Sequence, residues 1–173
     1  MDIKTTLEEE HSKSQTIKIV NFIGDDKARF KILVNLFLNG EYRITQRAAM
    51  PVGYVAIAHP FLIKPYIGKF VEKLEDTEQH PAIPRNILRI FEEIEIPEKY
   101  AARVLDLCYK FMADPKQPIA VRAFSITVVV NISRKYPELI NELKIMLQEL
   151  ASIPQQSPAV KSRIKQAFKL LNK

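Results

Sequence analysis

The chain has 173 residues and a single cysteine, so it is long enough to bury about 70% of its unfolded surface and cannot form an internal disulfide. It contains no stretch of about eighteen uninterrupted apolar residues and does not begin with the basic-then-apolar layout of a signal peptide, so we expect a soluble cytoplasmic protein that does not contact membranes. The net charge of +6 is uneven, because residues 1–118 carry 17 basic and 17 acidic side chains whereas residues 119–173 carry nine and three.

The N-terminal part of the chain is punctuated by capping residues. Residues 2–24 are predicted to form one or two helices that end at Gly24, with Ser12 as a cap inside the segment. A carboxylate at Asp25 or Asp26 can then cap a helix that runs through Leu38, because it accepts hydrogen bonds from amides that are otherwise unpaired. The pair Asn39-Gly40 is typical of the end of such a helix.

The next helix begins near Arg43 and contains Pro51, which removes one hydrogen bond of the helix and is expected to kink it. Most other prolines stand where a helix can begin, since the amide of a first-turn residue has no partner in the helix. This punctuation favours short helices joined by tight turns.

One spacing of apolar residues recurs in four of the predicted helices. Apolar residues mostly occupy the positions four, seven, eight and eleven after an anchor, which places them on one face of a helix. These first-helix anchors are 39, 38 and 39 residues apart, at Ile44, Ile83, Val121 and Val160. The segment Gln117–Leu150 contains one complete pair of helices of this kind.

The same offsets describe a second set of helices that alternates with the first. Its anchors are 37, 37 and 39 residues apart, at Asp26, Ile63, Tyr100 and Leu139. Only the β-branched run Ser125–Val130 favours a strand. We predict a helix there as well, because the register agrees with the other segments and a helix that is apolar on most sides is expected between neighbouring repeats.

Two helices in a period of about forty residues are typical of HEAT or armadillo arrays, whereas tetratricopeptide and ankyrin repeats have periods of roughly 33–34 residues. The chain resembles HEAT repeats in detail at Asp114-Pro115, Pro118 and Val121-Arg122, with a weaker copy at Pro158–Lys161. The resemblance implies an all-α, right-handed α-α superhelix (solenoid) of about four to five HEAT-like helix pairs in a single domain, 1–173. We place the repeats at about 2–40, 41–78, 79–114 and 115–152, with a terminal half-repeat at 153–173.

The resemblance also implies two structural roles. In HEAT repeats the turn aspartate caps and braces neighbouring repeats and the arginine ties one repeat to the next, so these roles are expected of Asp114 and Arg122. The repeats that begin at Ile44 and Ile83 lack the aspartate.

We find no constellation that indicates catalysis. The histidines His11, His59 and His80 share no metal-ligand spacing, and Cys108 stands on an apolar helix face where a buried thiol is expected. The four glycines are isolated, which excludes a glycine-rich phosphate loop. A DNA glycosylase of the HEAT-like class would place tryptophans against the damaged base, and the chain has none. We therefore expect no enzyme activity, no metal and no cofactor.

The second helices of such arrays line the concave side, and their surface positions are the predicted site of a protein partner. These positions carry basic stripes, with an acidic stripe on the last second helix at Glu138, Glu142 and Glu149. Tyr42, Tyr66 and Tyr109 are candidate anchors, since tyrosine combines apolar area with a polar tip. Solvated, helix-spaced charges and packing tyrosines explain the same residues without a ligand. The candidate partner-binding residues are Lys27, Lys31, Lys69, Lys73, Lys99, Arg103 and Lys110.

The excess of basic residues at the C-terminal end favours a second hypothesis, binding of nucleic acid or ribonucleoprotein. Phosphate contacts by these residues would make the affinity fall steeply with salt. A basic helix used for solubility or for protein contact explains the same pattern. The candidate nucleic-acid-binding residues are Lys161, Arg163, Lys165, Lys169 and Lys173, with Arg134 and Lys135 beside them.

Overall fold

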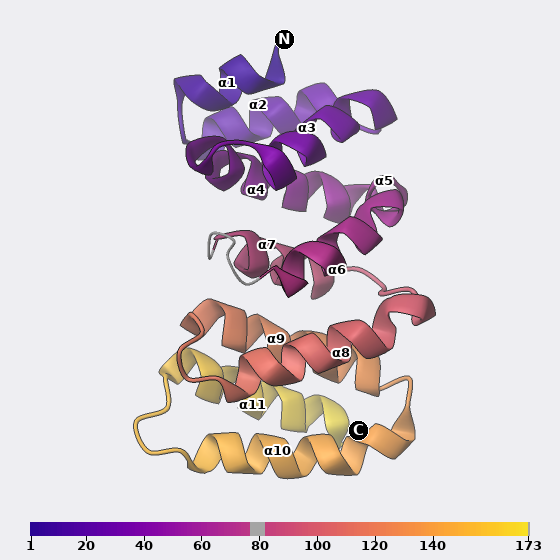
Figure 1. Ribbon diagram of the computed structural model, residues 1–173, viewed down its shortest axis with the longest axis vertical. Helices are drawn as coiled ribbons and strands as arrows, with labels where there is room; N and C mark the ends of the chain where they lie inside the picture. Colours follow the sequence, from indigo (N-terminus) through magenta and orange to yellow (C-terminus); the bar gives the residue numbers. More distant parts are fainter. Residues whose placement is uncertain (77–81, 173) are drawn as a thin grey trace. The chain divides into compact units, whose positions relative to one another are not determined.

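The computed structural model describes residues 1–76 and 82–172, and all regular structure in these residues is helical (Figure 1). The chain divides into two compact units, Met1–Ile94 and Glu95–Lys173, which we call unit 1 and unit 2. The predicted all-α class is confirmed, and the β-branched run Ser125–Val130 is helical. The repeat predicted at 79–114 contributes its first helix to unit 1 and its second helix to unit 2. The predicted repeat boundary between residues 78 and 79 falls within 77–81, which lie outside the described residues, as does residue 173.

Unit 1 begins with three helices whose caps agree with the sequence. Ser12 accepts from the amide of Gln15 at 3.1 Å, Gly24 ends the second helix with a φ of 51°, and Asp26 accepts from the amides of Ala28 and Arg29. The described helices of this unit are α1 (Ile3–Glu9), α2 (Lys13–Ile23), α3 (Lys27–Asn39), α4 (Tyr42–Ala58), α5 (Pro60–Ile63), the 3₁₀ turn η1 (Lys64–Tyr66), α6 (Ile67–Glu75) and α7 (Ala82–Phe91).

The turn between α3 and α4 requires the glycine that the sequence supplies. A Cβ atom at Gly40 would lie 2.4 Å from the carbonyl oxygen of Leu36 and 2.9 Å from a methyl group of Ile44. No side chain fits at that separation, so Gly40 lets α4 start immediately after α3. Helix α4 then continues through Pro51 to Ala58.

Helix α4 is the central element of unit 1, because it packs against α1, α2, α3 and α7. The phenylalanines of three helices form the core beside it. Phe70 of α6 lies with its ring centroid 5.8 Å from that of Phe37 in α3 and 6.4 Å from that of Phe91 in α7, and all three are fully buried. Each of these rings stands on an apolar face that the repeat offsets predict.

The second helix predicted from Ile63 is broken into α5, η1 and α6. Pro60 starts α5 and Pro65 follows immediately in η1, and neither has an amide that can donate a helical hydrogen bond. The break leaves the apolar face unchanged, since the anchor and the four residues at its offsets all remain buried: Ile63, Ile67, Phe70, Val71 and Leu74. It does change the surface, because a tight turn stands where a straight helix would run.

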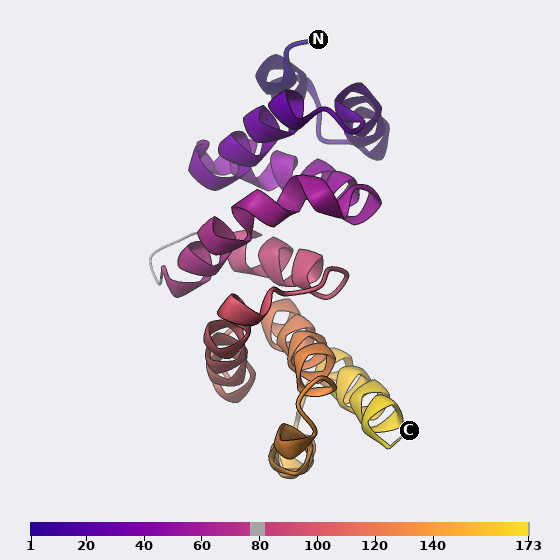
Figure 2. The ribbon, with the colours of Figure 1, turned by 90° about the vertical axis from the view of Figure 1, so that its right-hand side faces the viewer.

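Unit 2 contains α8 (Glu98–Ala113), α9 (Ile119–Ser133), the 3₁₀ turn η2 (Pro137–Leu139), α10 (Ile140–Ser152) and α11 (Pro158–Leu171). Helix α9 lies between α8 and α11 (Figure 2) and also contacts α10. Helix α9 is apolar on most of its faces, as expected for a helix that other helices cover on several sides. On α8 the offsets predict burial of Leu107 and Phe111, but the helix buries Leu105 and Met112 instead and leaves the predicted pair half-exposed.

Candidate partner-binding surface

The second helices of unit 1, α3 and α6, carry four of the predicted partner-binding residues. Lys27, Lys31 and Lys69 are exposed, and among the described residues none of them forms an ion pair. Lys73 is half-buried and its Nζ lies 3.6 Å from a carboxylate oxygen of Asp76. Three exposed cations therefore remain available on this face of the unit.

A hollow of about 250 Å³ lies between the start of α3 and the η1 turn. We call it the aromatic hollow. Its polar group is Lys27 of α3, and the other lining residues are apolar or aromatic. The complete lining consists of Lys27, Phe61, Leu62, Pro65 and Tyr66.

The walls of the aromatic hollow are held in place by packing. The Tyr66 ring makes an edge contact with the buried Phe30 ring at 6.0 Å, and the Phe61 ring makes one with His59 at the same separation. Leu62 is buried, whereas 47% of the Phe61 surface is exposed to solvent. An exposed aromatic ring therefore stands at the edge of a hollow whose floor is packed.

A second hollow, of about 330 Å³, lies further along the same pair of helices. It is lined by the end of α3 and by α6, and its charges balance: Lys69 and Lys73 oppose Glu72 and Asp76. Leu38 and Asn39 complete the lining. This hollow is therefore polar and close to neutral, unlike the aromatic hollow.

The remaining predicted partner-binding residues belong to unit 2 and follow one face of α8. Lys99, Arg103 and Lys110 are exposed, and the Lys99 ammonium lies 4.8 Å from the centroid of the Tyr100 ring. Such a cation over an aromatic face is weakly attracted to it. The structure therefore groups the seven candidates as four residues on unit 1 and three on unit 2.

The three candidate tyrosines differ in their surroundings. Tyr66 lines the aromatic hollow, and Tyr42 is more than half exposed at the start of α4, which is a first helix. Tyr109 on α8 is half-buried; burial raises the pKa of its phenol, the nearby Ser133 side chain partly offsets that rise and the Glu142 carboxylate adds to it. Of the three, Tyr66 has the setting of an anchor residue.

The basic residues predicted to bind nucleic acid have two different settings on α11: three lysines are exposed, and one arginine packs against α9. Lys161, Lys165 and Lys169 are exposed along α11. Arg163, in contrast, donates from Nη1 to the Thr127 hydroxyl at 2.9 Å and lies 5.5 Å from the centroid of the Phe124 ring, both on α9. The arginine thus fastens α11 to α9. Lys173 lies outside the described residues, and Lys135 forms an ion pair with Glu95.

Sequence reasoning missed two residues on these surfaces. Phe61 stands just before the anchor Ile63, where the repeat offsets assign no residue, and only its position between Pro60 and Pro65 marks it as part of a turn. Arg47 stands three residues after the anchor Ile44, as Arg163 does after Val160. An arginine at this shared position could have predicted a contact that holds the helix to its neighbour.

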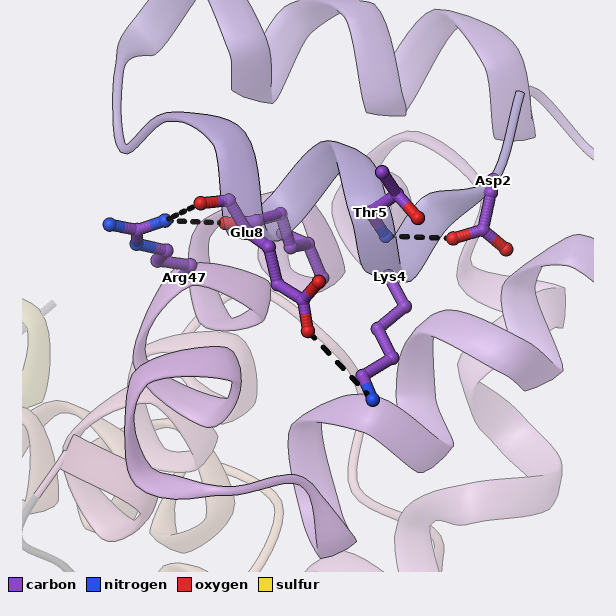
Figure 3. A network of polar contacts seen from close by, with 6 residues as sticks. Asp2, Lys4, Thr5, Glu8 and Arg47 are labelled. Carbon is purple, nitrogen blue, oxygen red and sulfur yellow. Dashed lines mark hydrogen bonds and ion pairs between the residues drawn. The ribbon is translucent and has the colours of Figure 1, made fainter.

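Arg47 ends helix α1 by binding its last carbonyl groups. Its Nη1 donates to the carbonyl oxygens of Leu7 and Glu8, each at 2.8 Å (Figure 3). The last carbonyls of a helix have no partner inside it, so a guanidinium there both satisfies them and complements the helix dipole. Figure 3 also shows Lys4 paired with Glu8 at 3.8 Å, on the exposed side of the same short helix.

The groups that could carry chemistry are isolated in the described part of the chain. No three His, Cys, Asp or Glu side chains among residues 1–76 and 82–172 are placed to hold a metal ion. His80 lies outside these residues. Cys108 is fully buried, and burial raises the pKa of its thiol to about 12 despite a hydrogen bond with Ser125 that lowers it. A thiol in this state is a packing group and not a nucleophile.

A family model of the HEAT repeat domain matches residues 3–171. The chain belongs to the HEAT repeat family. No curated protein and no solved structure matches it. Membership confirms the expected HEAT-like solenoid class, in which helix pairs contact mainly their neighbours along the array. In the described residues, none of the helices has both the length and the apolar content to cross a bilayer.

The two residues that the HEAT pattern singles out make contacts of the kind the family implies. Arg122 is buried at the start of α9, and its Nε donates to the Met112 carbonyl at the end of α8, 3.2 Å away. Asp114 accepts from the Lys116 amide at 2.9 Å and from the Gln117 side chain at 3.3 Å, which closes the turn between the two helices. Arg122 and Asp114 together fix the α8–α9 junction.

Proposed function

We propose that the chain is a noncatalytic scaffold or adaptor of the cytoplasm that binds a protein partner through the second-helix faces of its HEAT repeats. The observation that supports this most is the face of α3 and α6, where exposed lysines border two open hollows. HEAT repeats typically mediate protein interactions, because arrays of helix pairs offer extended surfaces. Lys27, Lys31, Lys69 and Lys73 on unit 1 and Lys99, Arg103 and Lys110 on unit 2 are the proposed contacts.

The test is recovery of a partner from native lysate with tagged protein, with and without nuclease, followed by comparison of two variants of equal charge. The variant Lys31→Glu with Lys69→Glu reverses two exposed cations on the second helices of unit 1. The control Lys13→Glu with Lys18→Glu reverses two exposed cations on α2, a first helix. We expect the first variant to lose a partner that survives nuclease and the control to retain it. Equal retention by both would contradict the proposal.

A second candidate function is nucleic-acid binding through the basic end. It is favoured by the exposed row Lys161, Lys165 and Lys169 on α11. Replacement of all three by Gln would abolish binding of a labelled RNA or DNA oligonucleotide, as measured by fluorescence anisotropy at 50 mM salt. Full affinity in the triple variant would contradict this function and leave the scaffold proposal intact.

A further inference from the structure

The aromatic hollow has the dimensions of a site for one side chain. Pockets that enclose small-molecule ligands have volumes of about 300–1,000 Å³ and surround most of the ligand. The aromatic hollow, at about 250 Å³, is smaller and open, and its lining supplies only one charged group, Lys27. In protein interfaces, pockets of this kind receive a single apolar anchor residue that contributes much of the binding energy.

The lining is also prepared for binding. Tyr66 and Phe61 are held by edge contacts with Phe30 and His59, Leu62 is buried, and the Pro65 ring has a fixed backbone angle. The apolar lining itself would need little ordering when a side chain enters, so the entropy cost of binding falls mainly on the lysines around it. The exposed part of Phe61 becomes covered in the same step.

Lysines outnumber carboxylates around the aromatic hollow. Lys27 lines it, Lys64 stands on the η1 turn that forms its other side, and Lys31 follows one helical turn after Lys27. Among the described residues none of these three lysines forms an ion pair. The nearby carboxylate of Asp26 is already engaged with the first amides of α3 and with Arg29 at 3.4 Å, and Asp25 beside it is exposed.

We propose that the aromatic hollow binds an acidic segment of a partner protein by receiving one aromatic or large aliphatic side chain, while flanking carboxylates contact Lys27, Lys31 and Lys64. This inference rests on the proposed scaffold function and names the chemistry of the partner. Charge complementarity decides the occupant: the three lysines would repel a basic segment and attract an acidic one, whereas a neutral segment would gain nothing from them. The apolar side chain supplies affinity, and the carboxylates supply selectivity and speed of encounter.

The probe for this site is a fluorescein-labelled peptide of eight Glu and Asp residues around one central Phe. We expect it to bind the protein at least tenfold more tightly than the same peptide with a central Ala, as measured by anisotropy at 50 mM salt. Lys27→Glu with Lys64→Glu should weaken binding at least tenfold, and the control Lys13→Glu with Lys18→Glu should change it less than twofold. The difference between the variants should shrink at 500 mM salt, because exposed charges are screened there.

A second pair of variants tests the apolar wall of the hollow without changing charge. Phe61→Ala removes the exposed ring at the edge of the hollow, and Ile57→Ala removes an apolar side chain of similar exposure, 42%, from α4. Only the first should weaken peptide binding, about fivefold, with the helical circular dichroism of both unchanged. Equal binding of the Ala-centred peptide, or tighter binding of a Lys-rich peptide or of an oligonucleotide at the same residues, would overturn the inference. A basic peptide bound there would still support a protein-binding face.

Discussion

Helices α9 and α11 of unit 2 carry the same apolar spacing but have different neighbours. Helix α9 packs against α8, α10 and α11, whereas the contacts of α11 in the described part of the chain are chiefly with α9 and α10. Their residues correspond at a separation of 39, which places Lys161, Lys165 and Lys169 of α11 at the positions of Arg122, Ile126 and Val130 of α9. The three α9 residues are buried and the three lysines are exposed.

This comparison shows that the repeat carries two kinds of information. The offsets of four, seven, eight and eleven mark the face that both helices bury, and this face packs in either setting. The face at Ile126 and Val130 is apolar where a further helix covers it, and its equivalent is lysine-rich where α11 has fewer neighbours. A polar outer face is what the exposed side of a repeat array needs for solubility. The lysine row therefore has a structural explanation that requires no ligand.

The largest effect is expected from moving the α11 pattern onto α9. Ile126→Lys places a charge at a position where the residue is only 1% exposed, and burial of an ammonium group is costly. We expect the protein to lose more than about 4 kcal/mol of stability, which is a large part of the roughly 5–15 kcal/mol that stabilises a typical domain. The reverse change at the equivalent position, Lys165→Ile, should leave urea unfolding within about 0.5 kcal/mol. Similar stabilities of the two variants would show that these equivalent positions of α9 and α11 do not differ in burial.

The sequence predicted the helical faces well because burial of one face depends mainly on local spacing. The offsets from Asp26 select Phe30, Leu33, Val34 and Phe37, and all four are buried in α3. On α8 the offsets fail for Leu107 and Phe111, since the neighbours of that helix cover Leu105 and Met112 instead. Which neighbours a helix has is decided by tertiary packing, and residue spacing does not record it.

The candidate site was predicted only in part. The lysines of α3 and α6 were recognisable from their helical positions, but the aromatic hollow depends on the break at Pro65 and on the ring of Phe61, which no repeat offset includes. Arg163 was counted with the other basic residues because charge alone does not show a contact with Thr127. Hollows and fastening contacts arise between elements, so they become visible only when the elements are placed.

The second largest effect is expected at the α8–α9 junction. Arg122→Met keeps the apolar stem of the side chain but removes the donor to the Met112 carbonyl. A buried hydrogen bond from a charged group contributes about 1.5–3 kcal/mol, and we expect a loss of that size in urea unfolding of the protein. The control Lys161→Met, at the equivalent exposed position of α11, should cost less than about 0.5 kcal/mol. If Arg122→Met cost as little as Lys161→Met, the hydrogen bond would add nothing to stability and Arg122 would contribute through its apolar stem alone.

The buried thiol of Cys108 on α8 predicts that stability depends on pH. Burial raises the pKa of Cys108 from 9.0 to about 12, so the folded state keeps the thiol neutral. The free energy of unfolding is therefore independent of this thiol's ionisation below pH 9. It falls as the pH rises from 9 toward 12, by roughly 1.4 kcal/mol per pH unit, because the unfolded chain releases the proton and the folded chain keeps it. Between pH 8 and pH 10 the wild-type protein should lose about 1.4 kcal/mol more than Cys108→Ala in urea unfolding. Parallel losses would show that the thiol titrates normally.

A smaller effect is expected where α11 is fastened to α9. Arg163→Ala removes the hydrogen bond to Thr127 and the contact with the Phe124 ring, which together contribute about 1–2 kcal/mol for a half-buried arginine. Thr127→Val removes only the acceptor and should account for about half of that loss in thermal unfolding. If the Arg163 and Thr127 variants were additive in the double mutant, the two residues would not interact.

The smallest effect on stability is expected from the lysine row itself, and it separates the structural explanation from the nucleic-acid hypothesis. Replacement of Lys161, Lys165 and Lys169 by Gln keeps α11 polar, so urea unfolding should change by less than about 0.5 kcal/mol per residue. Because the triple variant is expected to stay folded, a change in oligonucleotide affinity reports on phosphate contacts. A row that serves only as a polar face predicts weak binding before and after replacement, with no change in its dependence on salt. A row that binds nucleic acid predicts that the slope of log affinity against log salt decreases by about one for each phosphate contact removed.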